Sequence, residues 1–102
     1  MKIYASYADS VLYIRLDGEM DEHNAAAARR EADKLADGYA HSSRVIFDLK
    51  NVTFMDSTGI GFLIGRYKKF LRLGVPSYIT NPTPSTDKIL LMSGVYTLMP
   101  KV

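Results

Sequence analysis

The sequence predicts one small α/β domain spanning residues 1–102, in which helices pack on a mixed sheet of four to five strands. Two kinds of segment alternate along the chain. Short runs rich in β-branched and aromatic residues are typical of strands, and the segments between them have apolar residues that recur at helical spacing. The chain has 102 residues, of which 47% are hydrophobic, and this is enough for a single modest core.

The sheet is expected to begin with a hairpin. Residues 2–8 and 11–16 alternate apolar and polar side chains, and Asp9 and Ser10 between them are typical of a tight turn. The acidic segment 17–22 comes next, and we expect it to form a solvated loop.

An alanine-rich segment predicts the first helix. We expect Asn24 to be its N-cap and Gly38 to end it, because these residue types favour those positions. His23 is then a residue of the helix start and His41 a solvated loop residue. The apolar residues on one face of this helix are Ala25, Ala28, Ala32, Leu35 and Ala36.

The strongest pattern is a buried strand followed closely by an amphipathic helix. Residues 45–49 are an apolar run, and from Ser57 to about Leu73 apolar residues recur at helical spacing until Gly74. Ser57 therefore lies at or next to the N-cap, where backbone N–H groups lack partners and the helix dipole is positive. Its hydroxyl is suited to an acceptor or a phosphoryl group, although most serines at such positions only cap the helix.

Two glycines interrupt the first turns of this helix. Gly59 and Gly61 each cost about 0.5–1 kcal/mol relative to alanine, so their presence requires a local reason. Close contact between the backbone and a partner surface is one such reason. Asp56 and the second hydroxyl of Thr58 lie beside the same helix start.

The C-terminal part predicts a further strand, a short helix and a last strand. Residues 75–80 form the first of these strands, Thr83 and Pro84 favour a helix start, and residues 95–99 predict a fifth strand. The unit 45–80 should be parallel with a right-handed crossover. Because sites in such sheets lie beyond the carboxyl ends of strands, Ser57 and the acidic loop are expected at one end of the domain.

Composition limits the classes of function. The chain has no cysteine, which excludes disulfides and thiolate metal sites and fits a reducing cytoplasm. The net charge of +2 is too small to argue for direct nucleic-acid binding, and no run is long enough to span a membrane. The basic residues Arg66, Lys68, Lys69 and Arg72 are expected on the exposed side of their helix.

Catalytic and metal-binding patterns are weak. The segment 56–59 differs by one residue from the triplet of aspartic proteases, and Met55 replaces the first glycine of a nucleophile elbow. No phosphate-binding glycine loop is present, and the acidic residues of 17–22 lack calcium-loop spacing. We therefore expect no catalysis, no metal and no cofactor.

Several motifs together resemble a known family. They are Gly18-Glu19-Met20-Asp21, the strand 45–49, Phe54-Met55-Asp56-Ser57-Thr58-Gly59-Ile60-Gly61, Gly65-Arg66-Tyr67-Lys68 and Met92-Ser93-Gly94. In these the chain resembles the bacterial anti-sigma factor antagonists of the STAS domain family, and within it the sporulation branch that acts on the anti-sigma F factor. The resemblance runs from about Val11 to Leu98.

The resemblance implies a function in transcription regulation. Members of the family bind an anti-sigma factor that is also a serine kinase, and thereby free a sigma factor. It implies that Ser57 is the phosphoacceptor, that a phosphatase restores it, and that nucleotide is contacted only weakly, through the partner. It also implies partner contacts at Asp21, Thr58, Gly59 and Gly61, with Asp56 beside them.

Two other readings stay open. One is a STAS regulatory module in another phospho-relay, in transporter regulation or in nucleotide sensing, and the other is a small hydrolase that uses Ser57. Family members commonly continue into a last helix, which is expected to be missing from a chain that stops at Val102.

Overall fold

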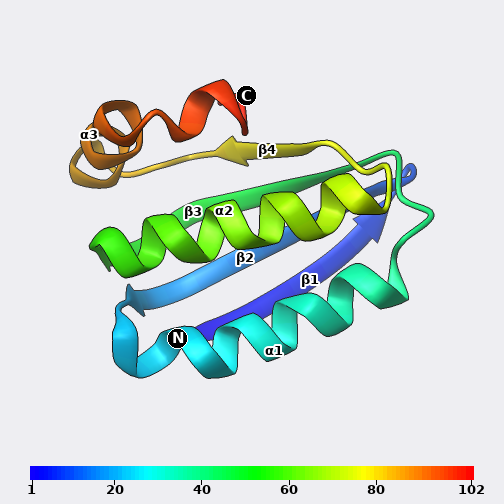
Figure 1. Ribbon diagram of the computed structural model, residues 1–102, viewed down its shortest axis with the longest axis horizontal. Helices are drawn as coiled ribbons and strands as arrows, with labels where there is room; N and C mark the ends of the chain where they lie inside the picture. The colour runs from blue at the N-terminus through cyan, green and yellow to red at the C-terminus, as the bar shows by residue number, and fades with distance from the viewer.

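The computed structural model describes all 102 residues and has one four-stranded mixed sheet in the order β1-β2-β3-β4 (Figure 1). Strands β1 and β2 are antiparallel, whereas β2, β3 and β4 run parallel. The elements are β1 (Lys2–Ala8), β2 (Val11–Met20), α1 (Glu22–Gly38), β3 (Arg44–Met55), α2 (Ser57–Arg72), β4 (Ser77–Thr80), α3 (Pro84–Ser93) and a 3₁₀ helix (Val95–Thr97). The predicted α/β fold class is confirmed.

Helices α1 and α2 lie side by side on one face of the sheet, and α3 lies at the β4 edge (Figure 1). The core fills the space between that face and the helices, and Phe47 of β3 meets Phe70 of α2 edge to face, with ring centroids 6.1 Å apart. The four small buried side chains Ala25, Ala28, Ala32 and Ala36 line the inner face of α1, as predicted. No helix combines the length and apolarity needed to cross a bilayer.

The hairpin forms at the predicted turn, where Asp9 and Ser10 both have positive φ. The segment expected to be an acidic loop is different. Residues 17–20 continue β2, with one register shift just before Asp17 and a second between Gly18, whose φ is +112°, and Glu19. The expectation of a loop was wrong because pairing with β3 satisfies the backbone of this segment.

The expected fifth strand is absent. Residues 95–97 form a 3₁₀ turn after Gly94, whose φ of +81° ends α3, and only an isolated bridge joins Ile79 to Lys101. Val95 and Met99 are buried, whereas Thr97, which would share their face in a strand, is exposed, so the segment reaches the core through a turn. The sheet therefore has four strands.

The C-terminal residues are tied to α3 by a small polar cluster. The hydroxyl of Tyr96 and the ammonium of Lys101 both donate to the carboxylate of Asp87. These two donors, the tyrosine first, hold the pKa of Asp87 below its ordinary value. Burial and the same carboxylate raise the pKa of Tyr96.

Arg66 was expected to be exposed on α2, and this was wrong. Its side chain is 7% exposed, between α1 and α2, with Nε 2.8 Å from Oδ1 of Asp33 and the guanidinium over the ring of Phe62. Neither Nε nor Nη1 completes a well-aligned hydrogen bond, and burial lowers the pKa of Arg66. A second ion pair, Lys69 to Asp37, joins the same helices nearer the surface.

Candidate functional site

The candidate site is built where two parallel strands end together. Met20, the last residue of β2, is the register partner of Met55, the last residue of β3. Asp21 and Asp56 follow these methionines directly, and each is the N-cap of the helix that comes next. The structure therefore brings Ser57 and Asp21 to the same end of the sheet, as the topology predicted.

The two carboxylates cap their helices in the same way. Oδ1 of Asp21 accepts from the backbone N–H groups of His23 at 3.0 Å and Asn24 at 3.2 Å. Asn24, predicted to be the cap, is instead the third helical residue, and its side-chain amide donates to the Asp21 carboxylate and to the carbonyl of Glu19. The prediction missed Asp21 because aspartate and asparagine are nearly equal as caps.

Ser57 is the first residue of α2, next to the cap and not the cap itself. Oδ1 of Asp56 accepts from the N–H groups of Thr58 at 2.9 Å and Gly59 at 3.4 Å, so Asp56 caps the helix, which is the role that a serine often has at a helix start. The Ser57 residue is exposed at this end of the domain, while Thr58 is half-buried. The hydroxyl of Ser57 is therefore not needed to cap the first N–H groups of α2.

The two glycines of α2 have different surroundings. Gly59 is buried, and a Cβ added to it would lie 2.5 Å from Cγ of Met55 and 2.7 Å from Cγ of Met20. Its missing side chain therefore lets α2 rest on the paired strand ends, and this internal contact, not a partner, explains the glycine. Gly61 is exposed, with nothing within 4 Å of such a Cβ.

An apolar groove opens beside Ser57, between α2 and α3. It has a volume of about 470 Å³; Ile60, Ile89 and Met92 supply its apolar walls. Asp56, Ser57 and Ser93 form its polar rim. Met92 is 77% exposed, so its side chain is open to solvent on the groove wall.

The sequence did not reveal this groove. Among the apolar residues of α3, only Leu90 is fully buried. The available signal was the run from Ile89 to Met92, which has more apolar side chains in succession than one buried face of a short helix can use. The site holds no group of three acidic or histidine side chains that would suit a metal ion.

Known proteins resemble this chain over most of its length. Residues 3–102 match the STAS domain. The chain belongs to the STAS domain family. This STAS domain is 33% identical over 100 residues to a protein of Paenibacillus polymyxa named anti-sigma F factor antagonist. The matched region covers 98% of this chain and 85% of that protein. The resemblance seen in the sequence is confirmed at the level of the family.

Two solved structures show the same fold. The anti-sigma factor antagonist SpoIIAA in its unphosphorylated form has a TM-score of 0.78 and 23% identity, over 99% of this STAS domain and 88% of that chain. The phosphorylated form of SpoIIAA, described as a Bacillus cell fate determinant, has a TM-score of 0.71 and 24% identity, over 99% and 91%. At these identities the two structures bear on the fold alone.

Proposed function

We propose that this STAS domain is an anti-sigma factor antagonist that phosphorylation of Ser57 switches off. It binds an anti-sigma factor that is also a serine kinase, so that a sporulation sigma factor is released, and a phosphatase restores the binding form. The observation that carries the proposal is the exposed hydroxyl at the start of α2, on the rim of an apolar groove. The name of the 33% identical relative and the phosphorylated state of SpoIIAA support it.

The groove supplies the affinity in this proposal. Its walls carry no charge, and an apolar side chain of the partner that fills it removes Ile60, Ile89 and Met92 from water. The exposed first turn of α2 lies on the rim, so the partner that fills the groove also covers Ser57. Gly61, which has open space around it, permits the partner backbone to come close. Asp21 and Asp56 add negative charge at the same end.

Phosphorylation acts on this contact through charge. It adds about −1.5 to −2 at Ser57, next to the Asp56 carboxylate. The first-turn N–H groups of Thr58 and Gly59 are already bound by that carboxylate, so the phosphate finds its best donors occupied. A strongly hydrated dianion on the rim must lose water when the partner closes over the groove, and binding weakens. Because Ser57 is exposed and packs against nothing in the core, the fold survives the modification.

The decisive experiment incubates the protein with an anti-sigma F factor and ATP and locates the phosphate by mass spectrometry. We expect one phosphate, on Ser57, and none after Ser57→Ala. The Ser57→Ala protein should bind the anti-sigma factor as the wild type does, and Ser57→Asp at least about tenfold more weakly. Ser93→Ala, a second hydroxyl on the rim, is the matched control and should be phosphorylated normally. Equal affinities of Ser57→Ala and Ser57→Asp would remove the proposal.

The groove can be tested separately from the serine. Met92→Asp places a charge in the groove wall and should reduce affinity for the anti-sigma factor, measured by calorimetry. Leu91→Asp is the matched control, because Leu91 is 68% exposed on the same helix but does not line the groove. If the two variants lose affinity equally, the groove is not the binding surface.

A further inference from the structure

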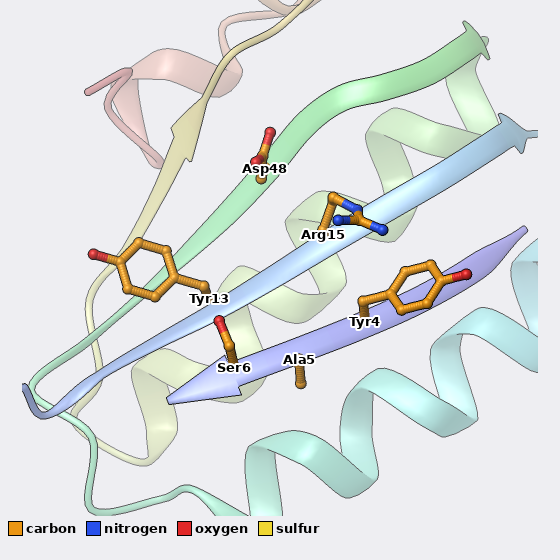
Figure 2. A pocket seen from close by; sticks show the side chains of 6 residues that line it. All are labelled: Tyr4, Ala5, Ser6, Tyr13, Arg15 and Asp48. Atoms are coloured by element: carbon orange, nitrogen blue, oxygen red, sulfur yellow. The ribbon is translucent and has the colours of Figure 1, made fainter. Parts of the chain in front are cut away.

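The face of the sheet opposite the helices is uncovered and carries an ordered set of side chains. Strand register places them in two rows that cross all four strands. The first row is Tyr4, Arg15, Asp48 and Thr80, and the second is Ser6, Tyr13, Ile46 and Tyr78. Figure 2 shows Tyr4, Tyr13, Arg15 and Asp48 standing on this face, which we call the open face, while Ala5 points the other way.

The open face is hollowed and amphipathic. A depression of about 280 Å³ lies among Tyr4, Ser6, Tyr13, Arg15 and Asp48. The guanidinium of Arg15 lies 4.4 Å from the centre of the Tyr4 ring, and these tyrosines are 45% and 38% exposed. Tyrosine and arginine are the residue types that concentrate at the centres of protein interfaces.

Each row is complementary to the same row of a second copy when that row is read in the opposite strand order, from β4 to β1. In a two-fold arrangement with the axis parallel to the strands and between β2 and β3, every β2 residue faces its own register partner on β3 of the second copy. Arg15 then faces Asp48, and Tyr13 lies over Ile46, which its neighbours already bury to 5% exposure, each twice. At the edges Tyr4 faces Thr80 and Ser6 faces Tyr78, so hydroxyl groups meet hydroxyl groups. No like charges oppose one another in these rows.

We propose that the open face is the surface on which a second copy of this chain docks, sheet against sheet, with Arg15 of each copy paired to Asp48 of the other. Two sheets packed in this way lie about 10 Å apart, with their strands roughly aligned. The carboxylate of Asp48 is free to accept at Oδ2, because its contacts with Lys50 and Asn81 both use Oδ1. Arg15 keeps Nη1 free, since its ion pair with Asp17 uses Nε and Nη2.

The size of the face sets the strength expected. Four strands about 4.8 Å apart and about six residues long give a footprint of roughly 400 Å² on each copy. Stable interfaces bury about 800 Å² on each partner, so this dimer belongs to the weak, transient class. We expect it to be populated only at roughly 0.1–1 mM protein, the weak end of the affinity scale.

The dimer leaves the candidate site accessible. Both α1 and α2 lie on the covered face of the sheet, opposite the open face (Figure 1). Ser57 and the groove between α2 and α3 therefore stay outside the proposed interface. This inference stands whether or not the proposed phosphorylation switch is correct.

Charge exchange tests the proposal. Sedimentation equilibrium of the wild type up to about 1 mM should show a reversible monomer–dimer equilibrium. Arg15→Asp and Asp48→Arg should each weaken association at least about tenfold, because each places like charges in contact. The double variant, which restores the pair with the charges reversed, should return to within about threefold of the wild type.

Controls separate a lost interface from a lost fold. Arg30→Asp makes the same charge change on α1, which lies on the other face of the sheet, and should leave association unchanged. Circular dichroism of every variant checks folding, and concentration-dependent broadening of the Tyr4 and Tyr13 ring signals tests the wild type without mutation. A wild type that stays monomeric at about 1 mM refutes the proposal, as does a double variant no better than the singles. Binding of single-stranded decathymidine to a monomer through these tyrosines would also refute it and assign the face to a nucleic acid.

Discussion

Replacing Gly59 with alanine should destabilise the protein, whereas the same replacement at Gly61, one half-turn further along α2, should stabilise it. Both glycines lie inside the same helix, so both variants gain the same kind of backbone term. Only the surroundings differ. Gly59 faces Met20 and Met55 at the paired ends of β2 and β3, and Gly61 faces open space.

The magnitudes follow from these contacts. Alanine is favoured over glycine in a helix by about 0.5–1 kcal/mol, and at Gly61 nothing opposes that gain. At Gly59 the new methyl would lie 2.5 Å and 2.7 Å from two methionine Cγ atoms and 3.2 Å from Cβ of Met20. Overpacking of this kind costs about 1–3 kcal/mol, and because both methionines are buried we expect the upper half of that range. After the helix gain is subtracted, the net loss is about 1–2.5 kcal/mol.

Urea unfolding followed by circular dichroism measures both variants. Gly61→Ala should raise the midpoint and increase the melting temperature by roughly 2–8 °C, and Gly59→Ala should lower the midpoint at an unchanged m-value. Shifts of both midpoints in the same direction would refute the argument that Gly59 is required by internal packing. If the proposed partner contact is correct, Gly61→Ala also weakens binding of the anti-sigma factor while it stabilises the fold.

Three further predictions concern charged side chains. Asp33→Ala leaves the buried guanidinium of Arg66 without its counter-ion and should lower the free energy of unfolding by about 2–3 kcal/mol. Asp37→Ala, at the exposed ion pair with Lys69, should lower it by less than about 1 kcal/mol. Equal losses for the two variants in urea unfolding would contradict this prediction. Asp56→Ala removes the cap of α2 and should cost about 1 kcal/mol, and Asp56→Asn should recover most of it by the same measurement. The lowered pKa of Asp87 stabilises the folded state above its ordinary value of about 4, and the contribution is lost as pH falls through the folded-state pKa. Stability measured between about pH 7 and pH 3 should therefore fall more steeply for the wild type than for Asp87→Asn, and parallel curves would exclude the effect.

Much of the fold could be predicted because its signals are local. The turn at Asp9 and Ser10, the alanine face of α1 and the extent of α2 from Ser57 to the glycine after it all rest on residues close in sequence. The position of Ser57 at the start of a helix that follows a buried strand was predicted in the same way. Local patterns succeed here because helix spacing, capping and tight turns involve only neighbouring backbone groups.

The N-cap of α1 was missed for a local reason, but three other wrong predictions share a physical cause, which is packing between distant segments. Residues 17–20 were expected to be a loop because of their charge, but the backbone of β3 is available to pair with them. Arg66 was expected in water because of its polarity, but α1 covers it and supplies Asp33. The last apolar run was expected to be a strand, but it forms a 3₁₀ turn after Gly94 that packs Val95 and Met99 into the core and leaves Thr97 exposed.

By itself, the sequence determined the α/β class, the order of the main elements and the serine at the head of α2, since each depends on spacing along the chain. Only the tertiary structure decided that Gly59 rests on two methionines and that α3 completes an apolar groove. These features depend on contacts between side chains of elements that are distant in sequence, and local sequence patterns do not determine such contacts.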